Sequence, residues 1–259
     1  MSKFIPLFLF LILQITSACS SANKYANGKE LAQIHLQIGT RYLTERNYPS
    51  ALKELLEAEK YDSNDPIIQN NLGLAYYVRA DFEKAKLHLK KAISLDPKYG
   101  DARSNYGRLL LDTGHASDAV EEFKTVVNDL TYPQPEKAKV NLGIAYLSVK
   151  KYKDAEKAFV SAIELNKNYC PAYIFLGRSF YDQNEFARAA KRLDQAVAVC
   201  KNEGFDEPQY FSAMAYMKLG EKEKAIARLE EIVDLTPKSA YAEKSRHFLK
   251  SLDSKETNQ

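Results

Sequence analysis

The sequence predicts an all-α fold, a right-handed superhelical solenoid of six antiparallel helix pairs followed by a C-terminal capping helix. Five glycines recur at intervals of 34, 34, 36 and 34 residues, at Gly39, Gly73, Gly107, Gly143 and Gly177. An alanine follows each glycine after twelve residues, from Ala51 to Ala189, and Ala213 with Ala225 continues the series. A period of this length is typical of stacked helix pairs that bury their apolar faces against one another. The repeats begin near residues 32, 66, 100, 136, 170 and 206 and together span 30–237.

Residues 1–18 have the order of a secretory signal peptide. Lys3 precedes an apolar run from Phe4 to Ile15, and short residues follow up to Ala18. A membrane-spanning helix needs about 20 apolar residues, and this run is shorter. A buried globular helix would show a polar face, which the run lacks. The order therefore favours a cleaved leader.

Cys19 follows the short residues directly, and this junction resembles a bacterial lipoprotein signal. In such signals the chain is cut before a cysteine whose sulfur carries a diacylglyceryl group. Ser17 and Ala18 fit that pattern, and Thr16 stands where leucine is usual. The lipoprotein sorting rule retains a protein at the inner membrane when Asp follows the cysteine, so Ser20 implies the outer membrane. Simple secretion and an unprocessed chain are the alternatives, and 19–29 is expected to be a tether.

The charge balance argues against a nucleic-acid partner. The chain holds 37 basic and 34 acidic residues, and removal of residues 1–18 takes away only Lys3, which leaves 36 against 34. A near-neutral chain lacks the basic excess by which nucleic-acid-binding proteins are recognised.

The repeat has a packing interpretation. We expect the glycine of each first helix to meet the alanine of the second helix at the closest approach of their axes, as Gly143 would meet Ala155. Large residues such as Phe159 would fill the remaining space. Pro97 and Pro237 follow second helices, where a helix should stop. The pattern resembles the tetratricopeptide repeat, and residues 238–259 would form the capping helix and tail.

No catalytic or metal-binding constellation is visible in the sequence. The histidines lie in different repeats, without cysteine or paired carboxylates at ligand spacing, at His35, His88, His115 and His247. Glycine-rich phosphate loops, nucleophile elbows and zinc-binding helix motifs are also absent from the sequence. We therefore expect neither an enzyme, nor a cofactor, nor a small-molecule substrate.

Two cysteines belong to the fifth repeat. Cys170 starts its first helix and Cys200 ends its second, and antiparallel pairing brings these two ends to one side. They form either a disulfide, which an oxidising compartment permits, or two independent buried thiols.

The first helices are expected to line a concave face that is more apolar than solvent requires, and such patches usually mark interaction sites. The expected partner-binding residues are Leu43, Asn71, Leu74, Tyr77, Asn105, Arg108, Leu111, Asn141, Ile144 and Leu147. The same face is expected to include Leu36, Thr40, Asn70, Ser104, Val140, Ile174, Arg178, Tyr181, Tyr210, Met214 and Met217. An amphipathic helix or an extended peptide would fit there. The recurring asparagines either hold the backbone of a partner or have a structural role.

Between the third and fourth repeats the period lengthens by two residues, at Tyr132-Pro133, before "NLG" and "AFVSAIELNKN". With the lipidation signal and six repeats, this insertion resembles the type IV pilus biogenesis lipoproteins, the pilotins of the PilF/PilW kind. The resemblance is sharpest from Gly39 to Asn168 and weakens after Cys170, so it supports no binding role for the last two repeats.

The resemblance implies an outer-membrane adaptor that faces the periplasm. Such a protein binds subunits of the secretin, the channel through which the pilus passes, and promotes their localisation and multimerisation. The alternative is a general periplasmic adaptor lipoprotein that positions cell-wall enzymes or envelope complexes. Gene neighbours encoding a pilus or a secretin would favour the first interpretation.

Replacement of Cys19 by alanine should prevent lipidation and leave the fold intact, because the repeats begin after residue 29. Membrane fractionation should then find the protein outside the outer membrane. Ser20→Asp should move it toward the inner membrane in a host that uses the lipoprotein sorting rule. A Cys19→Ala protein that remains fully in the outer-membrane fraction would contradict the lipoprotein interpretation.

Overall fold

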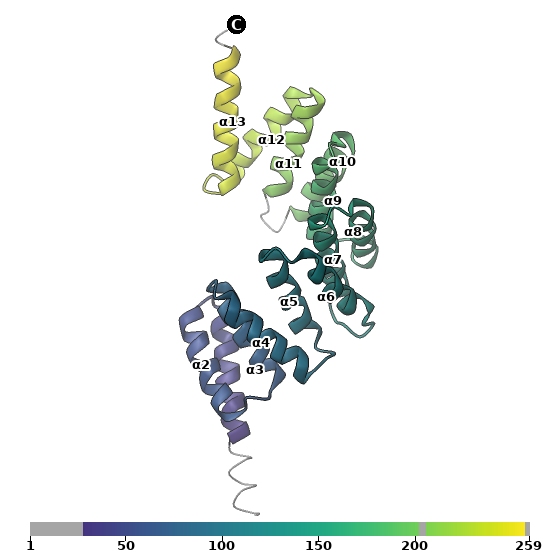
Figure 1. Cartoon of the computed structure of the whole chain (residues 1–259). Helices are drawn as coiled ribbons and strands as arrows, with labels where there is room; N and C mark the ends of the chain where they lie inside the picture. Colours follow the sequence, from purple (N-terminus) through teal and green to yellow (C-terminus); the bar gives the residue numbers. More distant parts are fainter. Residues whose placement is uncertain (1–27, 202–205, 257–259) are drawn as a thin grey trace, which may run out of the picture. The chain divides into compact units, whose positions relative to one another are not determined.

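The computed structural model describes residues 28–201 and 206–256, and every regular element among them is an α-helix (Figure 1). The all-α prediction is therefore confirmed. The leader, Cys19 and Ser20 lie outside the described residues. The chain divides into two compact units, one up to Thr113 and one from Gly114. Each unit is described by itself.

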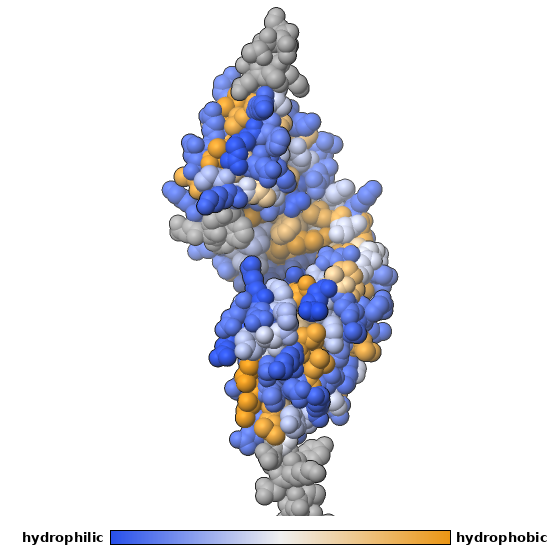
Figure 2. Space-filling model, turned by 90° about the vertical axis from the view of Figure 1, so that its left-hand side faces the viewer, coloured by the Kyte–Doolittle hydropathy of each residue, from blue (hydrophilic) through white to orange (hydrophobic). Residues whose placement is uncertain are grey.

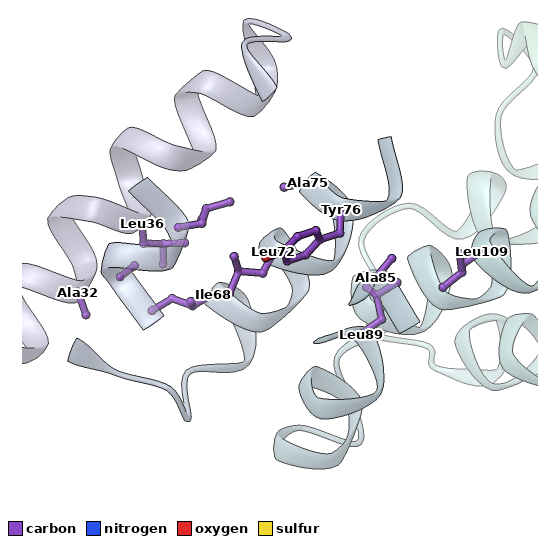
Figure 3. Packing of buried hydrophobic residues seen from close by; sticks show 11 residues of the cluster. Ala32, Leu36, Ile68, Leu72, Ala75, Tyr76, Ala85, Leu89 and Leu109 are labelled. Atoms are coloured by element: carbon purple, nitrogen blue, oxygen red, sulfur yellow. The ribbon is translucent and has the colours of Figure 1, made fainter. Parts of the chain in front are cut away.

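The first unit begins with a helix over residues 28–44. It continues with α2 (Tyr48–Tyr61), α3 (Pro66–Val78), α4 (Phe82–Leu95) and α5 (Gly100–Asp112). The core joins side chains from all five of these helices, including Leu55 of α2 and Leu109 of α5. Figure 3 shows Leu36 of the first helix, Leu72 of α3 and Leu89 of α4 within it. In this unit α3 also packs against α5, the next first helix.

The second unit holds the remaining helices: α6 (Ala116–Asn128), α7 (Pro135–Ser148), α8 (Tyr152–Leu165), α9 (Cys170–Asp182), α10 (Phe186–Cys200), α11 (Glu207–Leu219), α12 (Lys222–Leu235) and α13 (Ala240–Glu256). Consecutive helices pack against one another, and α7, α9 and α11 also pack in sequence as a layer of first helices. The last helix, α13, packs on α12 and α11, where Ala242 and Ser245 are buried.

Prolines and an acidic cap mark helix boundaries. Both α4 and α12 end two residues before a proline, Pro97 and Pro237, as the sequence predicts. Helix α3 begins with Pro66, and the Asp65 carboxylate accepts hydrogen bonds from the backbone N–H groups of Ile67 and Ile68. Such a cap satisfies donors that the first turn of a helix leaves free.

A left-handed turn ends each first helix, and the sequence did not reveal it. Non-glycine residues with φ between 58° and 61° occupy four of these turns, at Arg46, Ala80, Lys150 and Asn184, and glycines occupy two, at Gly114 and Gly220. At Ala80, the N–H of Asp81 donates to the Tyr76 carbonyl at 3.0 Å, the bond of a Schellman motif. A side chain there is strained, so the packing of the two helices must maintain the turn.

The glycines of four pairs, Gly39, Gly73, Gly143 and Gly177, face a large side chain of the second helix, not the expected alanine. A Cβ at Gly73 would lie 2.6 Å from Leu89 Cγ and 3.2 Å from the Leu89 backbone nitrogen. A Cβ at Gly143 would lie 2.4 Å from Cε1 of Phe159. The alanine twelve residues on is fully buried, but it is not the group nearest the glycine. The glycine thus makes room for a large residue that fills the pair's interior.

A disulfide joins Cys170 to Cys200, with 5.2 Å between their Cα atoms. It links the beginning of α9 to the end of α10, and Ile174 and Ala196 are buried beside it. The crosslink therefore fixes the open end of the fifth pair, ahead of the connection to α11.

Gly143→Leu should overpack the α7–α8 crossing and lower the free energy of unfolding by about 1–3 kcal/mol or more. Gly143→Ala should already destabilise, although alanine favours helices by about 1 kcal/mol over glycine. Thermal melts of the two variants and of Gly28→Leu test this, since a Cβ at Gly28 would meet nothing within 4 Å. An unchanged melting temperature for Gly143→Leu would show that this repeat register is wrong.

Candidate functional site

In the first unit, α3 and α5 present a mixed apolar and cationic surface, which we call the α3–α5 surface: Leu74, Tyr77, Arg108 and Leu111. Arg108 is exposed and the other three are half-buried. The Arg108 guanidinium carbon lies 5.6 Å from the centroid of the Tyr77 ring. The Tyr77 hydroxyl donates a hydrogen bond to the carboxylate of Asp112 on α5. Burial, reinforced by this bond, raises the Tyr77 pKa, so the phenol stays protonated and joins α3 to α5.

Five residues that the sequence predicts on the concave face of the first helices are buried instead, each 3–5% exposed: Leu36, Asn70, Ser104, Val140 and Ile174. Each of them stands four residues before the next residue of the same helix that is expected on the concave face. At that point of the helix, side chains turn toward the packed interior of their unit. The surface available to a partner is therefore narrower than the sequence indicates, and Leu74, Arg108 and Leu111 keep their expected exposure.

The asparagines of the first unit bond to one another across neighbouring first helices. Asn105 Nδ2 donates to Asn70 Oδ1 at 2.9 Å, and Asn70 Nδ2 donates to Asn71 Oδ1 at 3.1 Å. Asn71 Nδ2 donates to Thr40 Oγ1 at 2.8 Å, and only 8% of Asn71 is exposed. The amide of Asn71 is engaged within the solenoid at both ends. The structure thus favours a structural role for Asn71 over hydrogen bonding to the backbone of a partner.

In the second unit, Asn141, Ile144 and Leu147 of α7 are half-buried, and the two apolar side chains pack against the core of their unit. Within the described chain, the Asn141 side chain has no hydrogen-bond partner. Leu43, on the first helix of the first unit, is likewise half-buried against its core. These residues keep part of their surface available to a partner.

The sequence supported no binding role for α9 and α11, the first helices of the fifth and sixth repeats. At the position held by Asn71 and Asn141, α9 and α11 carry Phe175 and Phe211. Tyr181 and Phe211 meet edge to face, with ring centroids 5.9 Å apart. The change from asparagine to phenylalanine at one repeat position was the available signal. Figure 2 shows hydrophobic residues as separate patches within a largely hydrophilic face.

The described residues offer no group of three or more His, Cys, Asp and Glu that could hold a metal ion. Two histidines are engaged in packing: His35 Nδ1 lies 2.7 Å from Glu54, and His88 Nδ1 lies 2.8 Å from Gln69. Burial lowers the pKa of His88, which favours its neutral form. No helix within residues 28–201 and 206–256 has the length and hydropathy needed to cross a membrane.

One model of the tetratricopeptide repeat matches residues 79–142 and 180–245, a second matches 31–78 and a third matches 140–198. The chain belongs to the tetratricopeptide repeat family. Such repeats typically bind protein partners and are not enzymes. The surfaces on the first helices are therefore candidate protein-docking sites.

Among tetratricopeptide repeat proteins, this chain is related at low identity to PilF and PilW. It is 23% identical over 181 residues to the type IV pilus assembly protein PilF of Pseudomonas aeruginosa, covering 70% of the chain and 72% of that protein. The crystal structure of PilW, a widely conserved type IV pilus biogenesis factor, superposes with a TM-score of 0.76 at 19% identity, covering 82% of this chain and 97% of PilW. The structure of Pseudomonas aeruginosa PilF superposes with a TM-score of 0.70 at 19% identity, covering 85% of this chain and 99% of that PilF chain.

Asn71→Ala should lower the free energy of unfolding by about 1–3 kcal/mol, because it removes an acceptor from the buried Asn70 amide and breaks the hydrogen bond to Thr40. Asn141→Ala is the matched control and should change stability by less than about 0.5 kcal/mol. Urea unfolding of the two variants measures the difference. Equal, negligible effects would contradict the structural role assigned to Asn71.

Proposed function

We propose that this chain is an outer-membrane lipoprotein, a pilotin that binds secretin subunits and promotes their outer-membrane localisation and multimerisation in type IV pilus biogenesis. The relation to PilF and PilW carries the proposal, since the fold likeness extends over 97% of PilW.

Attachment and binding would be separate tasks in this protein. A lipid on Cys19 would supply the membrane attachment, and two or more acyl chains hold a protein stably. The chain from Cys19 to Gly28, where the described helix begins, can extend about 30 Å at most. The repeats would therefore work close to the periplasmic face of the membrane.

The α3–α5 surface is the part of the first unit that suits a secretin segment. Leu74 and Leu111 offer apolar contact, while the Arg108 guanidinium supplies a charged hydrogen-bond donor. An amphipathic helix that places apolar residues over the leucines and a carboxylate beside Arg108 would satisfy both. Tyr77 supports the surface through its bond to Asp112 and is therefore a poor choice for truncation.

Leu74→Ala combined with Leu111→Ala should weaken secretin binding roughly tenfold or more, because truncated central apolar contacts commonly lose over 1 kcal/mol each. Secretin multimers should fall and monomers should accumulate on a gel of envelope proteins. Leu87→Ala is the matched control, since Leu87 is 65% exposed and belongs to α4, a second helix.

The experiment distinguishes an error in the assigned binding surface from an error in the proposed function. A folded double variant with the unchanged multimer-to-monomer ratio would exclude the α3–α5 surface. A strain without the protein that keeps this ratio would contradict the pilotin function, and a general periplasmic adaptor would then explain the chain better.

A further inference from the structure

Four aromatic rings form a continuous series across α9, α11 and α13 in the second unit: Tyr181, Tyr210, Phe211 and Tyr241. Phe211 lies edge-on to Tyr181 at 5.9 Å, to Tyr210 at 5.7 Å and to Tyr241 at 6.3 Å between centroids. Tyr210 and Tyr241 are 5.2 Å apart. All four are half-buried, so each keeps part of its surface in solvent. We call this series the aromatic surface.

Two cations lie over the faces of these rings. The Arg178 guanidinium is 4.8 Å from the Phe211 centroid and bonds to Glu207 at 2.8 Å. Lys244 Nζ is 4.7 Å from the Tyr241 centroid and 5.9 Å from that of Tyr210. No carboxylate of the described residues pairs with Lys244, whereas Arg178 has Glu207. The aromatic surface thus carries one cation with an unmatched charge.

The ring geometry determines which ligand chemistry fits. The faces of aromatic rings attract cations and their edges attract negative charge. Since Arg178 and Lys244 already lie over faces of Phe211 and Tyr241, ring edges and ammonium protons are left for a partner. Carboxylates and backbone carbonyls of a partner complement both the ring edges and the ammonium protons. Apolar side chains of the partner complement the carbon atoms of the rings.

A neighbouring cleft extends the aromatic surface. It has a volume of about 570 Å³ and lies between α11 and α13, where Tyr210, Lys244, His247 and Phe248 line it. Glu243 is the one carboxylate in this lining. Because Tyr210 and Lys244 belong to both features, a chain crossing the aromatic surface could place an apolar side chain in the cleft.

We propose that α9, α11 and α13 form a second docking site, which binds an extended peptide of a protein partner with acidic side chains between apolar ones. The chain's own N-terminal residues 19–29 do not fit this description, because they contain Lys24 and Lys29 and no acidic residue. This site lies in the repeats after Cys170 and does not depend on the pilotin proposal.

Fluorescence polarisation with the full chain and a short labelled peptide of Glu-Pro-Leu repeats tests the site. The Glu peptide should bind, and its Gln-Pro-Leu counterpart should bind roughly fivefold more weakly, as expected when about 1 kcal/mol of exposed charge interaction is lost. Lys244→Glu should weaken binding of the Glu peptide roughly fivefold or more, and added salt should weaken it in the unchanged chain.

Lys250→Glu is the matched control and should leave binding of the Glu peptide unchanged. Lys250 lies on the same helix, α13, but lines the separate cleft toward α12 with Glu230 and Asp234. Thermal melts confirm that both variants fold, which is expected because both lysines are exposed.

Four results would overturn the proposal. The first is no binding of the Glu peptide at concentrations up to about 1 mM, and the second is equal affinity for the Glu and Gln peptides. The third is an equal loss of Glu-peptide binding in Lys244→Glu and Lys250→Glu. The fourth is a dimer in ultracentrifugation that Lys244→Glu abolishes, since a second copy would then occupy the surface. The secretin multimer ratio does not enter this test, so the two proposals fail separately.

Discussion

The close crossing of a glycine on one helix with a large side chain on the next is the contact on which the rest of the fold depends. At Gly73 a Cβ would lie 2.6 Å from Leu89, and at Gly143 it would lie 2.4 Å from Phe159. A leucine or phenylalanine can therefore fill the interior of each pair without forcing the two axes apart. At Gly39, Gly73, Gly143 and Gly177 this contact closes the interior of the pair, and both proposed docking surfaces lie on first helices, the second one together with α13.

Polar side chains hold neighbouring helices in register, first helices in the first unit and α10 against α11 in the second. In the first unit this is the network of Asn70, Asn71 and Asn105. In the second unit the Asp194 carboxylate accepts hydrogen bonds from Ser212 and Tyr216, and the bond to Asp194, with burial, raises the Tyr216 pKa to about 12. Such groups are already satisfied, so a partner contacts what they leave free: leucines, aromatic edges and unmatched cations.

The two docking surfaces differ in chemistry. The α3–α5 surface offers leucines beside Arg108, whereas the aromatic surface offers ring edges beside Lys244. The disulfide between Cys170 and Cys200 joins the beginning of α9, one of the three helices of the aromatic surface, to the end of α10. Disulfides persist in oxidising compartments, which agrees with the proposed periplasmic location. Under the two proposals, one solenoid would hold a secretin segment and an acidic peptide of a second protein.

The sequence by itself determined the helix pairs, because glycine, alanine and large residues recur every 34–36 residues and each helix encodes its own apolar spacing. It did not determine which large residue meets each glycine, nor that Asn71 bonds to Thr40 across 31 positions. Each residue turns a helix by about 100°, so a small error in the assumed face moves Leu36 or Asn70 from groove to interior. The left-handed turns at Arg46, Ala80 and Lys150 oppose local preference and exist because the packed helices require them. Contacts between residues far apart in the chain made these decisions, and such contacts exist only in the folded structure.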